Sequence, residues 1–135
     1  MDQSYEGYEE LSVSALAFIG DGVWEIFVRK LSLSHVPARA ASASEKLHAE
    51  TVKYVKASAQ AKAILRMKSS LDGEEAALVR RARNRKPRSL PRNADLMEYK
   101  WATAFEALIG YLYLAGRKEE LAEAMAAAAK IIEEG

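Results

Sequence analysis

Cysteine is absent from the 135-residue chain, which excludes disulfides, thiolate metal sites and cysteine nucleophiles. The chain has two histidines, His35 and His48, with no further ligand at metal-site spacing, which argues against a histidine-rich zinc site. No apolar run approaches the roughly 18 residues of a membrane span, and the acidic, polar start MDQSYEGYEE is unlike a signal peptide. We therefore expect a cytoplasmic protein without a membrane segment, folded as one domain over residues 1–135.

Acidic residues are missing from one strongly basic segment. The whole chain is close to neutral, with 20 Lys and Arg against 19 Asp and Glu. The cations of the basic segment are Arg80, Arg81, Arg83, Arg85, Lys86, Arg88 and Arg92. A solvated charged surface is one interpretation of such a run. In a near-neutral chain, however, a concentrated basic segment more often has an anionic partner, and we interpret it as a nucleic-acid contact.

Strand-like alternation is also absent, and almost every segment carries apolar residues at helical spacing. The predicted helices are about 12–31, a long one from about 37 or 44 to 67, then 72–83, 95–115 and 117–134. Asp72 is expected to cap the helix that follows it, and Gly116 to end the helix before it. The polar stretch 84–93, with Pro87 and Pro91, is expected to be an exposed loop. The sequence predicts an all-α fold.

Two carboxylates stand in apolar helical surroundings, Asp21 within AFIGDGVW and Glu106 within AFEALIG. An acid in such a place needs a cation or a charged partner. Without histidine or cysteine nearby, oxygen ligands favour magnesium or manganese over zinc, while a salt bridge to arginine or lysine is the alternative. Gly20 and Gly22 each cost a helix up to about 1 kcal/mol relative to alanine. We therefore expect close approach of another backbone or a ligand beside Asp21.

Two motifs carry a resemblance to the ribonuclease III family. Residues 16–25, LAFIGDGVWE, resemble its signature helix, and residues 103–114, TAFEALIGYLYL, resemble its second motif. The short length, the AFIGD form of the signature, the RRARN run at 80–84 and the Thr-x-x-Glu form of the second motif are most similar to Mini-ribonuclease III. This short bacterial branch lacks the double-stranded-RNA-binding domain. The similarity covers essentially residues 11–117.

The resemblance implies a homodimeric ribonuclease III-like helical bundle that hydrolyses double-stranded RNA to 5′-phosphate products. Its implied natural substrate is the large-subunit (23S) ribosomal RNA precursor. Asp21 and Glu106 fall on catalytic metal ligands of the family, for Mg²⁺ with Mn²⁺ as a substitute. Ala17 and Thr103 stand where the family has its other two acids. The acids we consider as partial replacements are Glu25, one turn after Asp21, and Asp95.

RNA contacts are expected at the basic segment, and a dimer interface on the apolar signature helix. The predicted RNA-binding residues are Arg80, Arg81, Arg83, Asn84, Arg85, Lys86, Arg88 and Arg92. The predicted interface residues are Phe18, Ile19 and Trp24. Two alternatives stay open at this point. The first is a non-catalytic RNA-binding module with a ribonuclease III fold, which the two missing acids favour. The second is an unrelated helical scaffold whose two motif acids form salt bridges.

Overall fold

Six α-helices make up most of the chain in a computed structural model that describes residues 4–37, 39, 43–87, 89–90 and 92–135. The helices are α1 (Val13–His35), α2 (Ala43–Val55), α3 (Ala57–Met67), α4 (Gly73–Asn84), α5 (Leu96–Leu114) and α6 (Lys118–Glu133), with 3-10 turns at Tyr8–Glu10 and Lys68–Ser70. The described residues contain no strand, which confirms the all-α prediction. None of the described helices is both long and apolar enough to cross a membrane.

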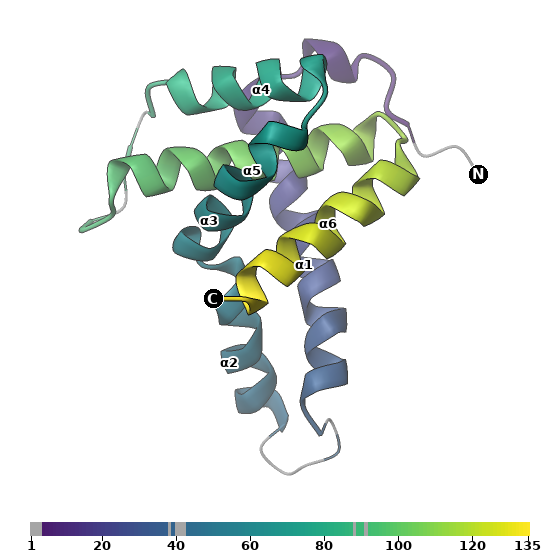
Figure 1. Cartoon of the computed structure of the whole chain (residues 1–135), viewed down its shortest axis with the longest axis vertical. Helices are drawn as coiled ribbons and strands as arrows, with labels where there is room; N and C mark the ends of the chain where they lie inside the picture. The colour runs from purple at the N-terminus through teal and green to yellow at the C-terminus, as the bar shows by residue number, and fades with distance from the viewer. Residues whose placement is uncertain (1–3, 38, 40–42, 88, 91) are drawn as a thin grey trace.

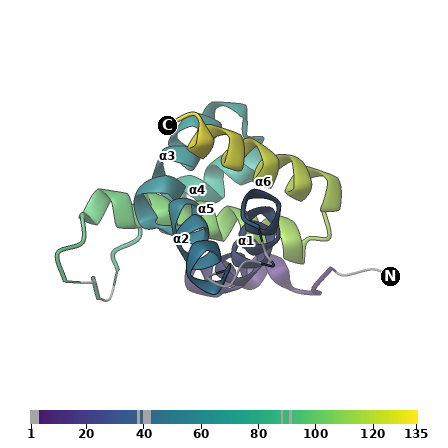
Figure 2. The ribbon, with the colours of Figure 1, turned by 90° about the horizontal axis from the view of Figure 1, so that it is seen from below.

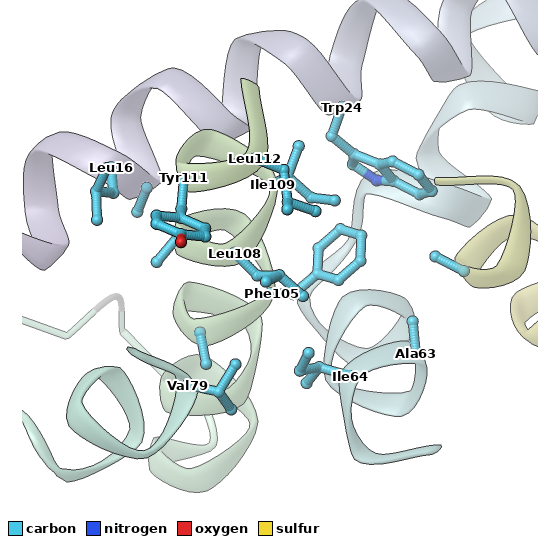
Figure 3. Packing of buried hydrophobic residues seen from close by; sticks show 14 of the residues in the cluster. Leu16, Trp24, Ala63, Ile64, Val79, Phe105, Leu108, Ile109, Tyr111 and Leu112 are labelled. Atoms are coloured by element: carbon cyan, nitrogen blue, oxygen red, sulfur yellow. The ribbon is translucent and has the colours of Figure 1, made fainter. Parts of the chain in front are cut away.

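Helix α5 is the centre of the fold. It packs against α1, α3, α4 and α6, and a helix that is apolar around its whole circumference must be buried in this way. Phe105, Leu108 and Ile109 of α5 are fully buried, and Figure 3 shows them among side chains from α1, α3 and α4. Helix α1 crosses α5 and continues past it to pair with α2 (Figure 1). The segment between α4 and α5 projects to one side of the helices (Figure 2).

The crossing of α1 and α5 is built on two glycines. A Cβ added to Gly20 would overlap the backbone carbonyl of Glu106, and one added to Gly110 would overlap the carbonyl of Leu16. The backbones therefore touch at two reciprocal points, and only glycine leaves room for them. The expected close approach beside Asp21 is confirmed for Gly20. For Gly22 it stays a prediction, because a Cβ there would meet no described atom of this chain within 4 Å and would leave room for a ligand or a second chain.

The predicted long helix ending at residue 67 is in fact two helices, because the chain is extended at Lys56 (φ −66°, ψ 152°). In an uninterrupted helix the carbonyl of Tyr54 would accept from the amide of residue 58. Here it accepts from the indole Nε1 of Trp24 at 3.0 Å instead. A tertiary hydrogen bond thus replaces a helical one, and no local sequence pattern predicts the break. The break lets α2 follow α1 while α3 packs on α5.

Trp24 belongs to the core, which corrects its prediction as a dimer-interface residue. Its side chain has no exposed surface. It packs edge-on against Phe105 with ring centroids 4.9 Å apart and stacks on Phe27 at 5.3 Å. A residue enclosed in this way is not available to a second chain. Phe18 is 79% exposed and Ile19 is half-buried, so these two predicted interface residues do reach the surface.

The predicted helix ends at Asp72 and Gly116 are confirmed. Asp72 accepts from the amide of Glu75 at 2.8 Å, and the Glu75 side chain accepts from the amide of Asp72 at 3.0 Å, which completes a capping box. Gly116 takes φ +74°, the left-handed conformation that ends many helices. The amide of Arg117 then donates to the carbonyl of Leu112 at 3.0 Å. These caps define where α4 begins and where α5 ends.

Gly20→Ala should destabilise the protein, because the added methyl group must push α1 away from α5. Overpacking of this kind costs about 1–3 kcal/mol or more, which exceeds the gain of about 1 kcal/mol that alanine has over glycine in a helix. Urea unfolding gives the measurement. Gly73→Ala is the matched control, since it is also helical with open space around the added atom, and should be neutral or slightly stabilising. Equal midpoints for Gly20→Ala and the unaltered chain would contradict the close crossing.

Candidate active site

Asp21 of α1 and Glu106 of α5 meet at the glycine crossing. Gly20 rests on the backbone of Glu106, so the next residue along α1 is brought beside the Glu106 side chain. Both carboxyl groups line one pocket. They interact directly, through a hydrogen bond when one is protonated and through charge repulsion when both are ionised. Two acids far apart in the chain therefore converge in space.

The pocket also brings together the positions of the two acids that this chain lacks. Its walls come from α1, from α5 and from the segment between α4 and α5. The lining residues are Ser14, Ala17, Phe18, Asp21, Arg85, Pro87, Ser89, Tyr99, Thr103 and Glu106. Ala17 and Thr103 thus stand beside the two carboxylates, and the Thr103 hydroxyl donates to the carbonyl of Tyr99 at 2.9 Å. The pocket keeps the four motif positions together with a carboxylate at two of them.

The pKa of Glu106 is raised to about 8. Burial is the main cause, followed by the adjacent Asp21 carboxyl group, and Glu25 adds a smaller repulsion. The Gln60 amide opposes the shift by donating to Oε2 of Glu106 at 3.4 Å. Among the described residues, no lysine, arginine or histidine pairs with Asp21 or Glu106. The described structure therefore lacks the salt bridges of the scaffold alternative, and two neighbouring carboxylates without a counter-charge are costly.

The donor atoms of the pocket suit a hydrated magnesium ion. Asp21 and Glu106 supply carboxylates, Thr103 a hydroxyl and Gln60 an amide beside them. The described part of the chain contains no cluster of three or more His, Cys, Asp or Glu residues of the kind that encloses a metal fully. Magnesium is commonly held by one or two carboxylates and keeps several of its waters. The residues fit such an ion, and they do not fit zinc.

The structure does not bring Asp95 into this pocket, which corrects its suggested role as a partial replacement. Glu25 does not line the pocket either, but it lies near enough to Glu106 to repel its carboxylate, so the suggested role of Glu25 stays a prediction. Glu25 accepts from Arg29 at 3.1 Å and lines a separate hollow between α1 and α2. Asp95 caps α5 by accepting from the amide of Glu98 at 2.8 Å. It precedes Glu106 by about three helical turns, or about 16 Å, and borders a hollow between α3 and α5.

The basic segment runs from the end of α4 into the segment that precedes α5. Its helical members are Arg80, Arg81, Arg83 and Asn84, and those after the helix are Arg85, Lys86 and Arg92. Arg88, also predicted to bind RNA, lies outside the described residues. No described cation of this segment pairs with a described carboxylate. Arg83 lies 5.8 Å from the ring centroid of Trp101, and Arg85 lines the pocket.

Ser14 and Gln60 are site residues that the sequence did not reveal. Gln60 is buried on α3, and its amide donates to Glu106. Ser14 lies on α1, and its hydroxyl accepts from Nη2 of Arg85 at 2.5 Å. Neither belongs to a recognisable motif, because both reach the site only through the packing of distant segments. The only local sign is that Ser14 shares a helix face with Ala17 and Asp21.

The family model for the ribonuclease III domain matches residues 14–117, a range that contains the whole pocket. The chain belongs to the ribonuclease III family. This excludes an unrelated helical scaffold, and it agrees with the pocket that joins the two family motifs.

Relatives of similar length confirm the resemblance to the short branch of the ribonuclease III family. The chain is 43% identical to a Mini-ribonuclease 3 from Thermoanaerobacter sp. over 129 residues, covering 96% of this chain and 88% of the relative. It is 48% identical to a Mini-ribonuclease 3 from Gloeobacter violaceus over 107 residues, covering 79% and 75%. A crystal structure of protein FN1578 from Fusobacterium nucleatum superposes with a TM-score of 0.76 at 34% identity, covering 88% of this chain and 92% of that one.

Glu106→Gln should stabilise the metal-free protein at alkaline pH. Between pH about 4.5 and about 8 the unfolded chain ionises Glu106 while the native chain keeps it protonated, so native stability falls as pH rises. Glutamine removes this loss. In EDTA, the free energies of unfolding of the two proteins, measured in urea, should agree near pH 4.5 and diverge up to about pH 8. The variant should then be more stable by about 1 kcal/mol after allowance for solvent screening. Exposed Glu123→Gln is the control. A variant that is less stable at pH 9 would contradict the repulsion.

Proposed function

We propose that this chain is a magnesium-dependent endoribonuclease that hydrolyses double-stranded RNA and leaves 5′-phosphate ends, with manganese able to replace magnesium. The observation that carries the proposal is the convergence of Asp21 and Glu106 in a pocket lined by both family motifs, with no cation of the described residues paired to either carboxylate. Membership of the ribonuclease III family supports the reaction and the substrate class. The relatives named Mini-ribonuclease 3 support it further.

In the proposed mechanism the two carboxylates hold the metal and do not attack the phosphate. When bound, magnesium lowers the pKa of a water and neutralises charge on the phosphate oxygens. Asp21 and Glu106 would hold it as oxygen donors, and the Gln60 amide orients the Glu106 carboxyl group. Because Glu106 is protonated below about pH 8 in the metal-free chain, it must lose a proton to act as a ligand. Both groups therefore serve as anions.

The proposed substrate is a duplex whose phosphates follow the basic segment. Arg81, Lys86 and Arg92 are exposed and have no described carboxylate partner, so they are free to contact phosphates. Contacts of this type make binding strongly dependent on salt. An A-form duplex offers a shallow minor groove and is recognised mainly by shape. We extend the proposal to the 23S ribosomal RNA precursor, on the family resemblance alone.

We also propose that two copies of the chain associate through α1. Phe18 is 79% exposed and Ile26 is 71% exposed. The two lie on one face of the helix, with Gly22 between them. Beside them is an apolar groove lined in part by Ile19 and Phe27. Exposed apolar surface of this kind marks an interaction site, and because Phe18 also lines the pocket, the second copy would lie next to the active site.

A non-catalytic RNA-binding module remains the second candidate. The observation that favours it is the presence of Ala17 and Thr103 at the positions of two family acids, both inside the pocket. Such a module would bind duplex RNA through the basic segment without cutting it. Binding and cleavage measured on the same duplex distinguish the two functions.

Asp21→Asn should reduce cleavage of a long RNA duplex by more than about 100-fold in magnesium, because it removes an anionic ligand of the metal. Cleavage by the unaltered chain should stop in excess EDTA and return with magnesium. Duplex binding by the variant, measured by gel shift without metal, should be unchanged. Glu123→Gln is the charge-matched control and should cleave normally. Equal cleavage with and without EDTA would exclude a metal mechanism, and binding without cleavage by the unaltered chain would support the module.

The chain should sediment with the mass of a dimer at micromolar concentration, and Ile26→Glu should sediment as a monomer. A charge on the exposed apolar face would have to be buried without a partner, which costs several kcal/mol. Far-ultraviolet circular dichroism should show unchanged helix content. Leu65→Glu is the control, because Leu65 is also exposed but lies on α3. A monomer mass for the unaltered chain would remove the dimer proposal.

A further inference from the structure

Arg85 differs from the other cations of the basic segment in where its side chain lies. It is the first residue after α4, with an extended backbone (φ −70°, ψ 136°). Its side chain reaches α1, where Nη2 donates to the hydroxyl of Ser14 at 2.5 Å. Ser14 is followed by Ala17 and Asp21 on the same face of α1. The guanidinium is therefore held on the wall of the pocket that contains the two carboxylates.

The rest of the described basic segment is placed differently. Arg80, Arg81, Lys86 and Arg92 are exposed, and none of them lines the pocket. Arg83 is engaged elsewhere, since it donates to Asn84 at 2.8 Å and lies over the Trp101 ring. Arg85 is half-buried and is the cation of the described segment that the fold places in the site.

The hydrogen bond to Ser14 leaves most of the N–H donors of Arg85 available for another group. A guanidinium has five N–H donors in a planar fork, and the described structure shows one of them occupied, by the neutral Ser14 hydroxyl. No described carboxylate pairs with it, although Asp21 and Glu106 line the same pocket. A fork of this kind matches two oxygens of one phosphate.

We infer that Arg85 binds the phosphate that is cleaved and that Ser14 positions it there, while the exposed cations bind phosphates farther along the duplex. The inference deepens the proposed function and rests on it. A phosphate placed between the metal site and the Arg85 guanidinium would be held from two sides by positive charge. Donors fixed where negative charge develops act most strongly in the transition state, so Arg85 acts mainly on the rate of cleavage. The exposed cations act on affinity.

The test compares variants of Arg85 and Ser14 with Lys86→Ala, which removes the neighbouring exposed cation. Single-turnover cleavage of a 30-base-pair RNA duplex is measured in magnesium with saturating protein, and binding is measured in EDTA at several salt concentrations. Arg85→Ala should lower the saturated rate by about 100-fold or more, while weakening binding no more than Lys86→Ala does. Lys86→Ala should reduce the salt slope by about one phosphate contact, and its saturated rate should fall far less than that of Arg85→Ala.

Conservative variants separate positioning from a general loss of structure. Arg85→Lys keeps the charge and loses the fork, so its saturated rate should lie between those of Arg85→Ala and the unaltered chain. Ser14→Ala should slow cleavage by about tenfold, the effect of losing a supporting hydrogen bond, and Ser14→Thr should restore most of the rate. Circular dichroism checks the helix content of each variant.

Two results overturn the inference in distinguishable ways. In the first, Arg85→Ala and Arg85→Lys both cleave at the rate of the unaltered chain when saturated and differ from it only in weaker binding. Arg85 would then contact a phosphate away from the cleaved bond, like the exposed cations. Absence of cleavage by the unaltered chain in magnesium and in manganese would overturn the proposed function, and the inference with it. The first result leaves the nuclease assignment intact.

Discussion

The backbone contact between α1 and α5 is the constraint on which the site depends. Gly20 and Gly110 each face a carbonyl of the opposite helix, so the two helices lie closer than any side chain would allow. The carbonyl that Gly20 touches is that of Glu106 itself, and Asp21 is the next residue along α1. The same contact therefore fixes the crossing and brings the two carboxylates together. A side chain at Gly20 or Gly110 would separate the carboxylates as well as the helices.

This arrangement sets function against stability. Burial of Glu106 beside Asp21 raises its pKa to about 8. The site therefore lowers the stability of the metal-free chain above neutral pH, and the rest of the core must offset this cost. Binding of a cation to the native state alone adds stability by mass action. The missing acids at Ala17 and Thr103 reduce the repulsion that the pocket would otherwise contain, because two carboxylates, not four, stand in it. A site of this composition loses charge that would hold the metal, and it gains a less strained metal-free fold.

The sequence predicted what is encoded locally or in a motif. The helical class and the caps at Asp72 and Gly116 followed from spacing and residue type, and the convergence of the two motif acids followed from the resemblance of both motifs to the ribonuclease III family. The break at Lys56 did not, because it depends on the hydrogen bond from Trp24 to the Tyr54 carbonyl, between segments 30 residues apart. The same bond explains why Trp24 belongs to the core. Periodicity showed that α1 is apolar on several sides, but it could not show which side the chain itself covers.

The wrong and the missing site predictions have the same physical cause, which is that contacts between helices cannot be read from one helix alone. Asp95 looked suitable because it is an acid just before the second motif, yet its side chain caps α5. Ser14 and Gln60 looked ordinary, yet packing brings them to Arg85 and Glu106. The position of a residue along a helix determines which face its side chain occupies. The packing of the neighbouring helices determines which groups that side chain contacts.

The Ser14–Arg85 contact also gives the basic segment an internal order. Arg85, the first residue after α4, is bound to Ser14 of α1, and the chain that follows projects from the helices before α5 begins (Figure 2). Arg85 lies beside the carboxylates, while the exposed cations lie on either side of it, Arg80 and Arg81 on α4 and Lys86 and Arg92 on the projecting part. In the proposed function, a duplex bound along these cations would be aligned with the pocket, because the phosphates of an A-form strand are regularly spaced and a fixed contact at Arg85 would set the register of the others. The exposed cations would then supply affinity for the duplex, and Arg85 would align the duplex with the pocket. The hydrogen bond to the neutral Ser14 hydroxyl keeps Arg85 at the site.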